Sequence, residues 1–332
     1  SGTFANLGLD MALYIMGAVA VIYTVMGGLK AVIYTDTIQW TILMTGLIFI
    51  GIPFAYMEIG GMEAIRSTVS PEMLSLTNLA WQDVVYWGVT IIPIWFVGMT
   101  LYQRIYACKD EKTAKKAWYL AGLFEWPVMA FLGVLLGLFA RVAADQGMFD
   151  YLGAQNISAT DPETGLPMLL RTVLPVGLLG AMMAAYFSAI LSTADSCLMA
   201  SSGNVVTDII GRFKKFNPDS STFLGLSQIV TLIIGALALL LAAAMENVLT
   251  LMLDSYSFMV SGLFVPVIGA LFWKRSTPAG AMSAMIAGGT VTLVLRYLEI
   301  GLPFNLDPNV FGITASAIIF VTISLFTEKN TE

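Results

Sequence analysis

Nine long apolar segments constrain this chain more than any other feature of its sequence. A helix needs about 20 mostly apolar residues to cross a bilayer. The segments that meet this requirement are Met11–Met26, Thr37–Tyr56, Val84–Ile105, Trp118–Ala140, Leu174–Val206, Leu224–Met245, Leu249–Trp273, Ala279–Leu298 and Phe311–Phe326. Only 11% of the residues are charged, against about 25% in a soluble domain. The sequence therefore predicts an all-α polytopic membrane protein with nine transmembrane helices in a lipid bilayer, and it excludes a nucleic-acid-binding protein.

The basic residues indicate how these segments are oriented. If the first residue lies outside, then twelve of the 16 Lys and Arg residues, including every lysine, fall on inner flanks. Such an excess of basic residues marks the cytoplasmic side. The outer flanks then hold Arg66, Arg141, Arg171 and Arg296. We expect a multi-pass protein of the cell (inner) membrane, with its C-terminus in the cytoplasm.

Four carboxylates lie in or at the edge of the apolar segments: Asp36, Glu125, Asp195 and Asp254. Ionisable residues at such positions are costly, and they are functional candidates by default. No Lys or Arg lies in the middle of a segment, so the sequence predicts no built-in counterion for these acids. The chain has no histidine. We therefore expect a hard cation held by oxygen atoms, either sodium or a proton, rather than a transition metal.

Hydroxyl groups surround one of these carboxylates. Helical spacing places Ser188, Ser192, Asp195 and Ser196 on roughly one face, with Thr193 beside it. This oxygen-rich stripe suits a small dehydrated cation. The alternative is that the hydroxyls bond back to their own helix. We favour that alternative for Ser201 and Ser202, and the cation-binding interpretation for the group around Asp195.

The other three carboxylates each have a structural alternative. Asp36 followed by Gln39 three residues later fits a capping box at a helix start. Glu125 precedes Pro127, which can kink a helix and free a carbonyl. The glutamate is therefore either part of a polar pocket or a protonated side chain bonded to a neighbouring helix. Asp254 is either functional or simply a residue at the outer end of its segment.

Four motifs, in this order along the chain, resemble those of the sodium/solute symporter family. They are Gly27–Gln39, the pair Gln103–Arg104, Ser192–Ser196 followed by Ala200–Ser202, and Ala270–Ala281. The resemblance covers essentially the whole chain as core helices four to twelve. It implies a LeuT-type fold of two inverted five-helix repeats, with residues 1–332 forming a single membrane domain. It also implies that the first three core helices precede this C-terminal portion, and that these missing N-terminal helices complete the sites.

The resemblance implies sodium-coupled symport of a small organic solute by alternating access, with no enzymatic activity and no cofactor besides sodium as the coupling ion. The family's shared sodium site falls on the Ala189 carbonyl, Ser192 and Thr193. Asp36 falls on an aspartate that supports cation binding there, and Asp195 and Ser196 fall where some members hold a second sodium. We expect no other metal site.

The substrate candidates implied by the resemblance are Trp95, Glu125, Asp254 and Tyr256. Glu125 stands near a position where the sugar-transporting members carry a lysine. This departure argues against sugar specificity and leaves the substrate open.

Three functions are alternatives to sodium symport. Proton coupling fits the same buried carboxylates. An intramembrane aspartyl protease would need Tyr-Asp and Gly-x-Gly-Asp motifs, but the pairs here are Thr35–Asp36 and Ala194–Asp195. A membrane sensor core would carry a signalling domain, and the chain ends at Glu332, six residues after its last apolar segment.

Overall fold

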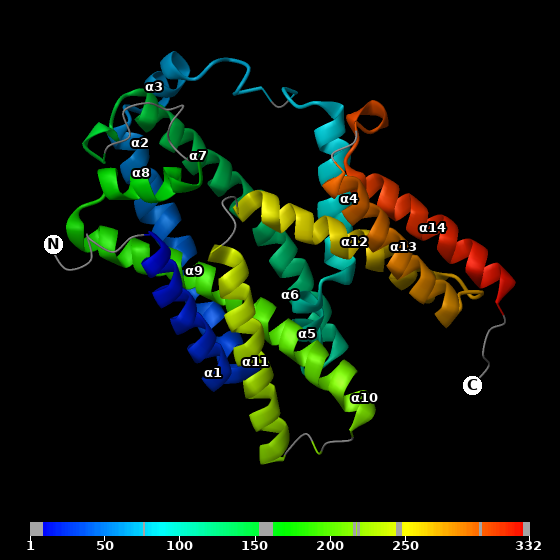
Figure 1. Ribbon diagram of the computed structural model, residues 1–332. Coiled ribbons are helices and arrows are strands. Elements are labelled where there is room, and N and C mark those ends of the chain that lie inside the picture. The colour runs from blue at the N-terminus through cyan, green and yellow to red at the C-terminus, as the bar shows by residue number, and fades with distance from the viewer. Residues whose placement is uncertain are drawn as a thin grey trace. The chain divides into compact units, whose positions relative to one another are not determined.

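The computed structural model describes residues 9–75, 77–152, 162–214, 217, 220–243, 248–298 and 301–327 (Figure 1). Every regular element in these ranges is a helix, which confirms the predicted all-α class. The α-helices are α1 (Leu9–Gly46), α2 (Ile52–Glu58), α3 (Gly61–Thr68), α4 (Trp81–Val97), α5 (Met99–Tyr106), α6 (Glu111–Phe124), α7 (Ala130–Asp145), α8 (Gly165–Val173), α9 (Val176–Gly203), α10 (Gly211–Phe213), α11 (Ser221–Ala243), α12 (Val248–Phe272), α13 (Pro278–Tyr297) and α14 (Pro308–Phe326). Wider π-helical turns occupy Leu47–Gly51, Glu125–Met129 and Asn204–Ile210.

Eight helical segments among the described residues are long and apolar enough to cross a membrane. They correspond to eight of the nine predicted segments. The remaining one, predicted at Trp118–Ala140, is helical throughout, because α6 continues through the π turn at Glu125–Met129 into α7. At Pro127 the helix therefore widens instead of breaking, as π turns allow. That this segment crosses the membrane stays a prediction.

The first two predicted segments both belong to α1, and Gly28 separates them. Its backbone angles are φ +60° and ψ −179°, a conformation that glycine adopts without a Cβ penalty. The helix resumes directly after Gly28, so Asp36 lies inside a helix and not at its first residue. The capping-box interpretation of Asp36 and Gln39 is therefore wrong.

Contacts between Cα atoms divide the chain into two compact units. Unit 1 comprises Ser1–Ser75 and Gln103–Ala243, and unit 2 comprises Leu76–Tyr102 and Ala244–Glu332. In unit 1, α1 packs against α9 and α11, which also contact each other. In unit 2, α12, α13 and α14 pack together and α4 lies against α12 and α14. These groupings can be followed in Figure 1.

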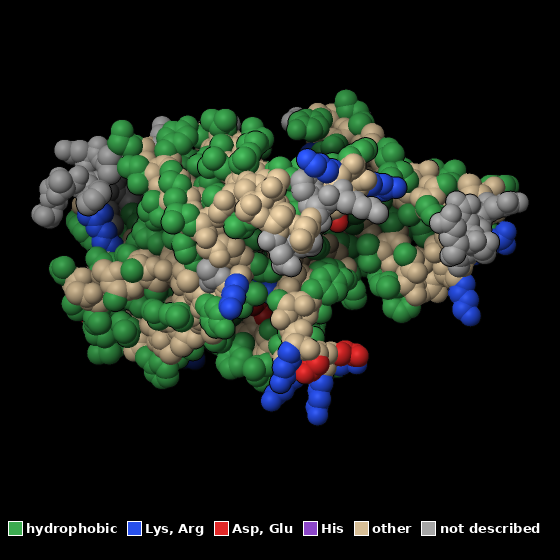
Figure 2. Space-filling view, turned by 90° about the horizontal axis from the view of Figure 1, so that it is seen from below, with side chains coloured by type: hydrophobic (Ala, Val, Ile, Leu, Met, Phe, Trp, Pro, Cys, Tyr) green, Lys and Arg blue, Asp and Glu red, His purple; other side chains and the backbone are tan. Residues whose placement is uncertain are grey.

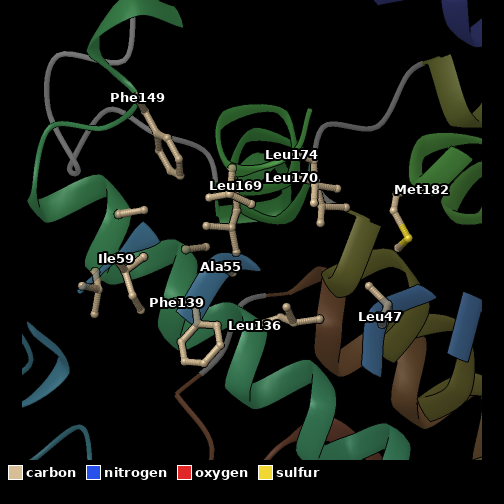
Figure 3. Close-up of a cluster of buried hydrophobic side chains, with 14 of the residues drawn as sticks. Leu47, Ala55, Ile59, Leu136, Phe139, Phe149, Leu169, Leu170, Leu174 and Met182 are labelled. Atoms are coloured by element: carbon tan, nitrogen blue, oxygen red, sulfur yellow. The ribbon is translucent and has the colours of Figure 1, made fainter. Parts of the chain in front are cut away.

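The largest buried apolar cluster lies in unit 1, where α2, α7 and α8 meet (Figure 3). Phe139 on α7, and Leu169 and Leu170 on α8, are at most 1% exposed. Between helices in a membrane, side chains of this size stabilise the structure through close van der Waals packing. The amide of Gln146 at the end of α7 donates to the Ile59 carbonyl at 2.9 Å. The cluster thus holds the end of the α1–α2 segment in place on the side remote from Gly28.

Helix α13 packs closely against α12 in unit 2. A Cβ atom added at Gly288 would overlap the carbonyl oxygen of Ser261 on α12 and the side chain of Ser316 on α14. Small residues of this kind let helix backbones approach each other in membranes. The Asn309 amide adds a polar tie, because it donates to the Thr90 hydroxyl on α4 at 2.9 Å.

Large apolar side chains cover much of the visible face of the molecule (Figure 2). Exposed examples on one helix, α11, are Leu237, Leu240 and Leu241. A water-soluble monomer rarely exposes apolar area on this scale. The same side chains suit a lipid environment, where a hydrocarbon surface has no cost.

Candidate functional site

Three oxygen atoms of the predicted sodium site lie together on α9. The Ser192 hydroxyl donates to the Ala189 carbonyl at 3.1 Å, and the Thr193 hydroxyl donates to the same oxygen at 3.3 Å. Ser and Thr readily make such bonds to the preceding turn of their own helix. The result is a carbonyl oxygen and two hydroxyl oxygens gathered within one turn, and oxygen donors of this kind suit a hard cation.

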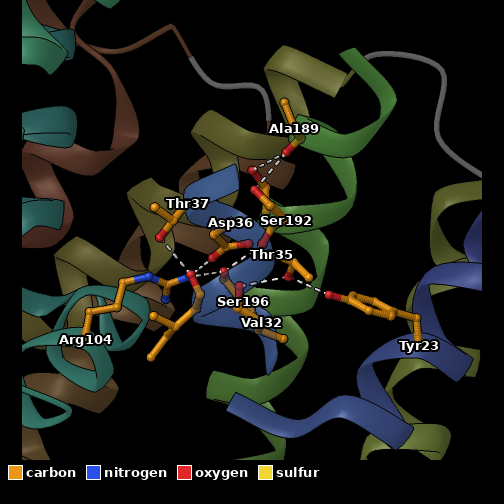
Figure 4. A network of polar contacts seen from close by, with 11 residues as sticks. Tyr23, Val32, Thr35, Asp36, Thr37, Arg104, Ala189, Ser192 and Ser196 are labelled. Atoms are coloured by element: carbon orange, nitrogen blue, oxygen red, sulfur yellow. Dashed lines mark hydrogen bonds and ion pairs between the residues drawn. The ribbon is translucent and has the colours of Figure 1, made fainter. Parts of the chain in front are cut away.

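Asp36 lies beside this part of α9, on the second half of α1 (Figure 4). Its Oδ2 atom is 2.7 Å from Nη2 of Arg104 on α5. The same Nη2 donates to the hydroxyl oxygen of Ser196 at 2.5 Å, and Ser196 donates to the Ser192 carbonyl at 2.7 Å. One guanidinium nitrogen therefore connects residues of α1, α5 and α9, all of them within unit 1.

Asp195 is completely buried, at 0% exposure. The hydroxyl of Thr24, on the first half of α1, donates to its Oδ1 atom. The same hydroxyl lies 2.8 Å from the Ala20 carbonyl oxygen. Residues on both sides of Gly28 thus reach α9. Thr24 contacts Asp195 directly, and Asp36 is joined to Ser196 through Arg104.

Two carboxylate oxygens in this region are buried and accept no hydrogen bond within the described part of the chain. They are Oδ1 of Asp36 and Oδ2 of Asp195. Burying an anionic oxygen without a partner is costly. A bound cation would remove that cost, so the oxygens on α1 and α9 fit the ion that the sequence predicted.

The prediction that the four carboxylates lack basic partners is wrong for two of them. Asp36 pairs with Arg104, and Oδ1 of Asp254 lies 2.7 Å from Nη2 of Arg296. Both arginines belong to the last turn of their helices. They count as flanking charges in the sequence, but a long Arg side chain can reach back along its helix.

Arg296 also binds a second carboxylate. Its Nη2 lies 3.2 Å from Oδ2 of Asp307, which caps α14 and accepts the Asn309 backbone N–H at 2.9 Å through Oδ1. Burial raises the pKa of the Asp307 carboxyl, while the Asn309 N–H and Arg296 act in the opposite direction. Asp254 therefore belongs to an ion-pair cluster, which gives it a structural role independent of any substrate.

The remaining substrate candidates fall in both units. Trp95 on α4 and Tyr256 on α12 belong to one apolar cluster in unit 2, built around Ile94, Val97 and Val260. Glu125 begins the π turn between α6 and α7 in unit 1, and its side chain is exposed. The structure brings Trp95 and Tyr256 together.

The hydroxyls for which a structural role was favoured do bond to their own helix. Ser201 donates to the Cys197 carbonyl at 2.8 Å, and Ser202 donates to the Met199 carbonyl at 3.4 Å. Ser192 and Thr193 make the same kind of bond. What distinguishes that pair is the shared acceptor, Ala189, and the nearby carboxylates.

Sequence reasoning missed two residues of this region. Thr24 had no signal beyond its place in an apolar segment. Arg104 stood in the Gln103–Arg104 motif, which placed it at the end of a segment without indicating where its side chain points. The neighbouring Gln103 amide donates to the Met199 carbonyl at 3.1 Å, so both residues of the motif contact α9.

These features define an all-helical membrane protein with oxygen-lined, acidic positions between two of its helices. The sequence pattern of the Sodium:solute symporter family matches residues 3–288, and the chain belongs to that family. This is a family of transporters and not of enzymes, which removes the aspartyl-protease alternative.

Two relatives illustrate the similarity. The chain is 26% identical to a sodium/glucose cotransporter of Vibrio parahaemolyticus, over 98% of this chain and 64% of the relative. It is 28% identical to the high-affinity proline transporter PutP of Bacillus subtilis (strain 168), over 98% of this chain and 68% of the relative. The chain thus spans about two thirds of the length of these proteins.

A solved structure of a Na+-coupled sialic acid symporter, in a substrate-bound outward-open state, has a similar fold. The TM-score is 0.77 and the sequence identity is 22%, over 98% of this chain and 68% of that structure. This confirms the LeuT-type fold expected from the sequence.

Proposed function

We propose that the protein is a sodium-coupled symporter of a small organic solute that works by alternating access. One observation carries this proposal. The Ala189 carbonyl and the Ser192 and Thr193 hydroxyls converge on α9, the helix that also carries the buried Asp195. Asp36, which pairs with Arg104, lies beside this part of α9. The carboxylates of Asp36 and Asp195 outnumber Arg104 by one charge, and one sodium ion would balance it.

Each oxygen group takes one role in this proposal. Ala189, Ser192 and Thr193 form the principal sodium site. Asp36 supplies negative charge beside it, and Asp195 with Ser196 forms a second cation position. Because a ligand shifts a conformation only by its differential affinity for the two states, these residues must hold sodium more tightly in the outward-open form. A charge moved across 100 mV contributes about 2.3 kcal/mol, which is enough to concentrate a neutral solute considerably.

The solute is small and organic. The relatives are named for glucose and for proline, so the family's common scaffold serves chemically different solutes. The Trp95–Tyr256 cluster supplies an apolar and aromatic contact surface in unit 2. Glu125 and Asp254 are the charged candidates, and the pairing of Asp254 with Arg296 makes it the weaker of the two.

The proposal also includes the arrangement of the chain in the membrane. Residues 1–332 correspond to core helices four to twelve of a single membrane domain. The three preceding core helices would supply the other half of the sodium and substrate sites. The multi-pass protein lies in the cell membrane with its C-terminus in the cytoplasm.

Proton coupling is the second candidate, and one contact favours it. The Thr24 hydroxyl has a single hydrogen but lies against two acceptors, the Ala20 carbonyl and Oδ1 of Asp195. Both contacts become hydrogen bonds if Asp195 carries a proton. A buried carboxyl that exchanges a proton at this position would couple transport to pH.

Uptake by the full-length protein in proteoliposomes tests both candidates. A panel of labelled glucose, proline, myo-inositol and sialic acid is offered, with sodium varied at fixed pH and with pH varied at fixed sodium. Sodium symport requires uptake that rises with external sodium. Uptake that follows the pH gradient without sodium supports the second candidate, and uptake indifferent to both gradients contradicts the proposal.

A further inference from the structure

A single atom of Arg104 contacts two of the proposed cation ligands at once. Nη2 lies 2.7 Å from Oδ2 of Asp36 on α1 and 2.5 Å from Oγ of Ser196 on α9 (Figure 4). The nitrogen thus fills the position that it shares between these two oxygens. A sodium ion that bridged Asp36 and Ser196 at this position would have to take the place of the guanidinium group.

We propose that Arg104 is a tethered cation that holds the Asp36–Ser196 pair until sodium displaces it, and that it lowers the protein's affinity for sodium. This inference rests on the proposed function and adds a specificity-determining residue to it. The guanidinium and the ion carry the same charge and use the same oxygens. Binding of the guanidinium at these oxygens therefore excludes the sodium ion, and binding of the sodium ion excludes the guanidinium.

The surroundings of Arg104 allow such an exchange. Its side chain is 34% exposed, whereas that of Asp36 is 21% exposed. The guanidinium is therefore less enclosed by the described residues than the carboxylate is. Arg104 lies in the last turn of α5, at the end of the third apolar segment, which the distribution of basic residues predicts to be cytoplasmic. Its return from that side would favour release of sodium to the cytoplasm.

The groups around Arg104 leave it in competition with sodium for Asp36 and Ser196. Oδ1 of Asp36 is buried without a partner, but it belongs to the carboxylate that Arg104 already neutralises. Ser196 donates its hydrogen to the Ser192 carbonyl, so its oxygen faces Arg104 as an acceptor. Asp195 keeps a second carboxylate nearby, which provides the net negative charge that attracts sodium.

Equilibrium binding of radioactive sodium to the purified full-length protein tests the proposal. The variants are Arg104→Gln, which removes the charge, and Arg104→Lys, which keeps it. The control is Lys109→Gln, which removes the same charge from an exposed residue of the following loop. We expect Arg104→Gln to bind sodium about fivefold more tightly, the factor for two unit charges about 4 Å apart in water-like surroundings. Arg104→Lys and Lys109→Gln should stay within about twofold of the wild type.

Unchanged or weaker binding by Arg104→Gln overturns this proposal if the wild type binds sodium. If neither the wild type nor Arg104→Gln binds sodium, the proposed function itself fails. A second measurement needs no variant that could misfold. Hydrogen exchange of the wild type should rise at residues 103–108 when sodium is added, since displaced Arg104 no longer ties α5 to α1 and α9. Exchange unaffected by sodium in this segment overturns the displacement.

Discussion

Arg296 on α13 is the shared partner of Asp254 on α12, with 2.7 Å between Nη2 and Oδ1, and the same nitrogen reaches Asp307 at the start of α14. The cluster therefore joins three helices of unit 2 through one positive charge and two negative charges. Removing the arginine leaves two half-buried carboxylates facing each other. Removing Asp254 leaves a pair that still balances.

This difference predicts that substituting Arg296 destabilises the protein more than substituting Asp254 does. Arg296→Gln should lower the free energy of unfolding by about 2 kcal/mol, and Asp254→Asn by about 1 kcal/mol or less, because leaving a charge unpaired costs more than losing one exposed pair. Thermal unfolding of the detergent-solubilised protein measures both. Arg141→Gln is the control, since its pair with Asp145 lies on a single helix of unit 1. An Asp254→Asn protein less stable than Arg296→Gln would contradict this account.

The close approach of α13 to α12 makes Gly288 sensitive to a single methyl group. Gly288→Ala should cost more than 2 kcal/mol, because the new Cβ overlaps the backbone of Ser261 and rigid backbone cannot move aside cheaply. Gly225→Ala on α11 is the matched control, since a Cβ there meets nothing within 4 Å. That substitution should be neutral or stabilising by up to about 1 kcal/mol. Equal thermal stability of the two variants would show that the helices can separate freely.

The proposed sodium ligands predict a selective loss of sodium dependence. The double substitution Ser192→Ala/Thr193→Ala should raise the sodium concentration for half-maximal uptake at least tenfold, because two of the three converging oxygens are lost. Ser201→Ala removes a hydroxyl of the same helix that bonds to Cys197, and it should leave sodium dependence unchanged. Comparable effects in both variants would mean that loss of helix hydroxyls in general, and not the site, is responsible.

Asp195→Asn distinguishes the two coupling ions. If Asp195 supplies charge to a second cation position, the amide should weaken sodium dependence by about tenfold and leave the pH profile of uptake unchanged. If Asp195 exchanges a proton, the amide should flatten the pH profile. Asp145→Asn, which removes the carboxylate of the Arg141–Asp145 ion pair of unit 1, is the control for a general effect of charge. An Asp195→Asn protein with normal sodium and pH dependence would remove Asp195 from the mechanism.

The predicted orientation can be checked with thiol labelling from each side of the membrane. A cysteine introduced at Lys112, in the exposed first turn of α6, should react with an impermeant reagent only from the cytoplasmic side. A cysteine at Glu63 on α3 should react only from outside. The opposite pattern would reverse the topology, and the C-terminus would then be external.

Apolar length alone was sufficient to locate the helices, because a bilayer imposes both the length and the composition of what crosses it. The first apolar segment ends at Gly27–Gly28 in the sequence, and α1 breaks at Gly28. The sequence did not show that the helix resumes directly after this glycine. Spacing on α9 placed Ser192, Asp195 and Ser196 on one face of the helix. The grouping of Ala189, Ser192 and Thr193 came from the resemblance, and that these residues bind sodium stays a prediction. Helical periodicity relates residues of the same helix, and it does not predict contacts between helices.

The partners of the carboxylates could not be predicted in the same way. Arg104 meets Asp36 across 68 positions of sequence, and Thr24 meets Asp195 across 171. Such contacts depend on which helices pack together and on where flexible side chains turn. The arginines were correctly placed near segment ends, but a position on a helix does not determine whether the side chain points to water or back along the helix.

Gly28 separates the two places where α1 reaches α9. The residues on its two sides reach α9 through different contacts, Thr24 through Asp195 and Asp36 through the Arg104–Ser196 contact, while the glycine itself has no atoms within 4 Å of a would-be Cβ. Torsional changes at Gly28 would therefore move Thr24 relative to Asp36 without bending either half of α1. The two contacts that α1 makes with the acidic part of α9 are thus linked through a residue that carries no charge and has no side chain.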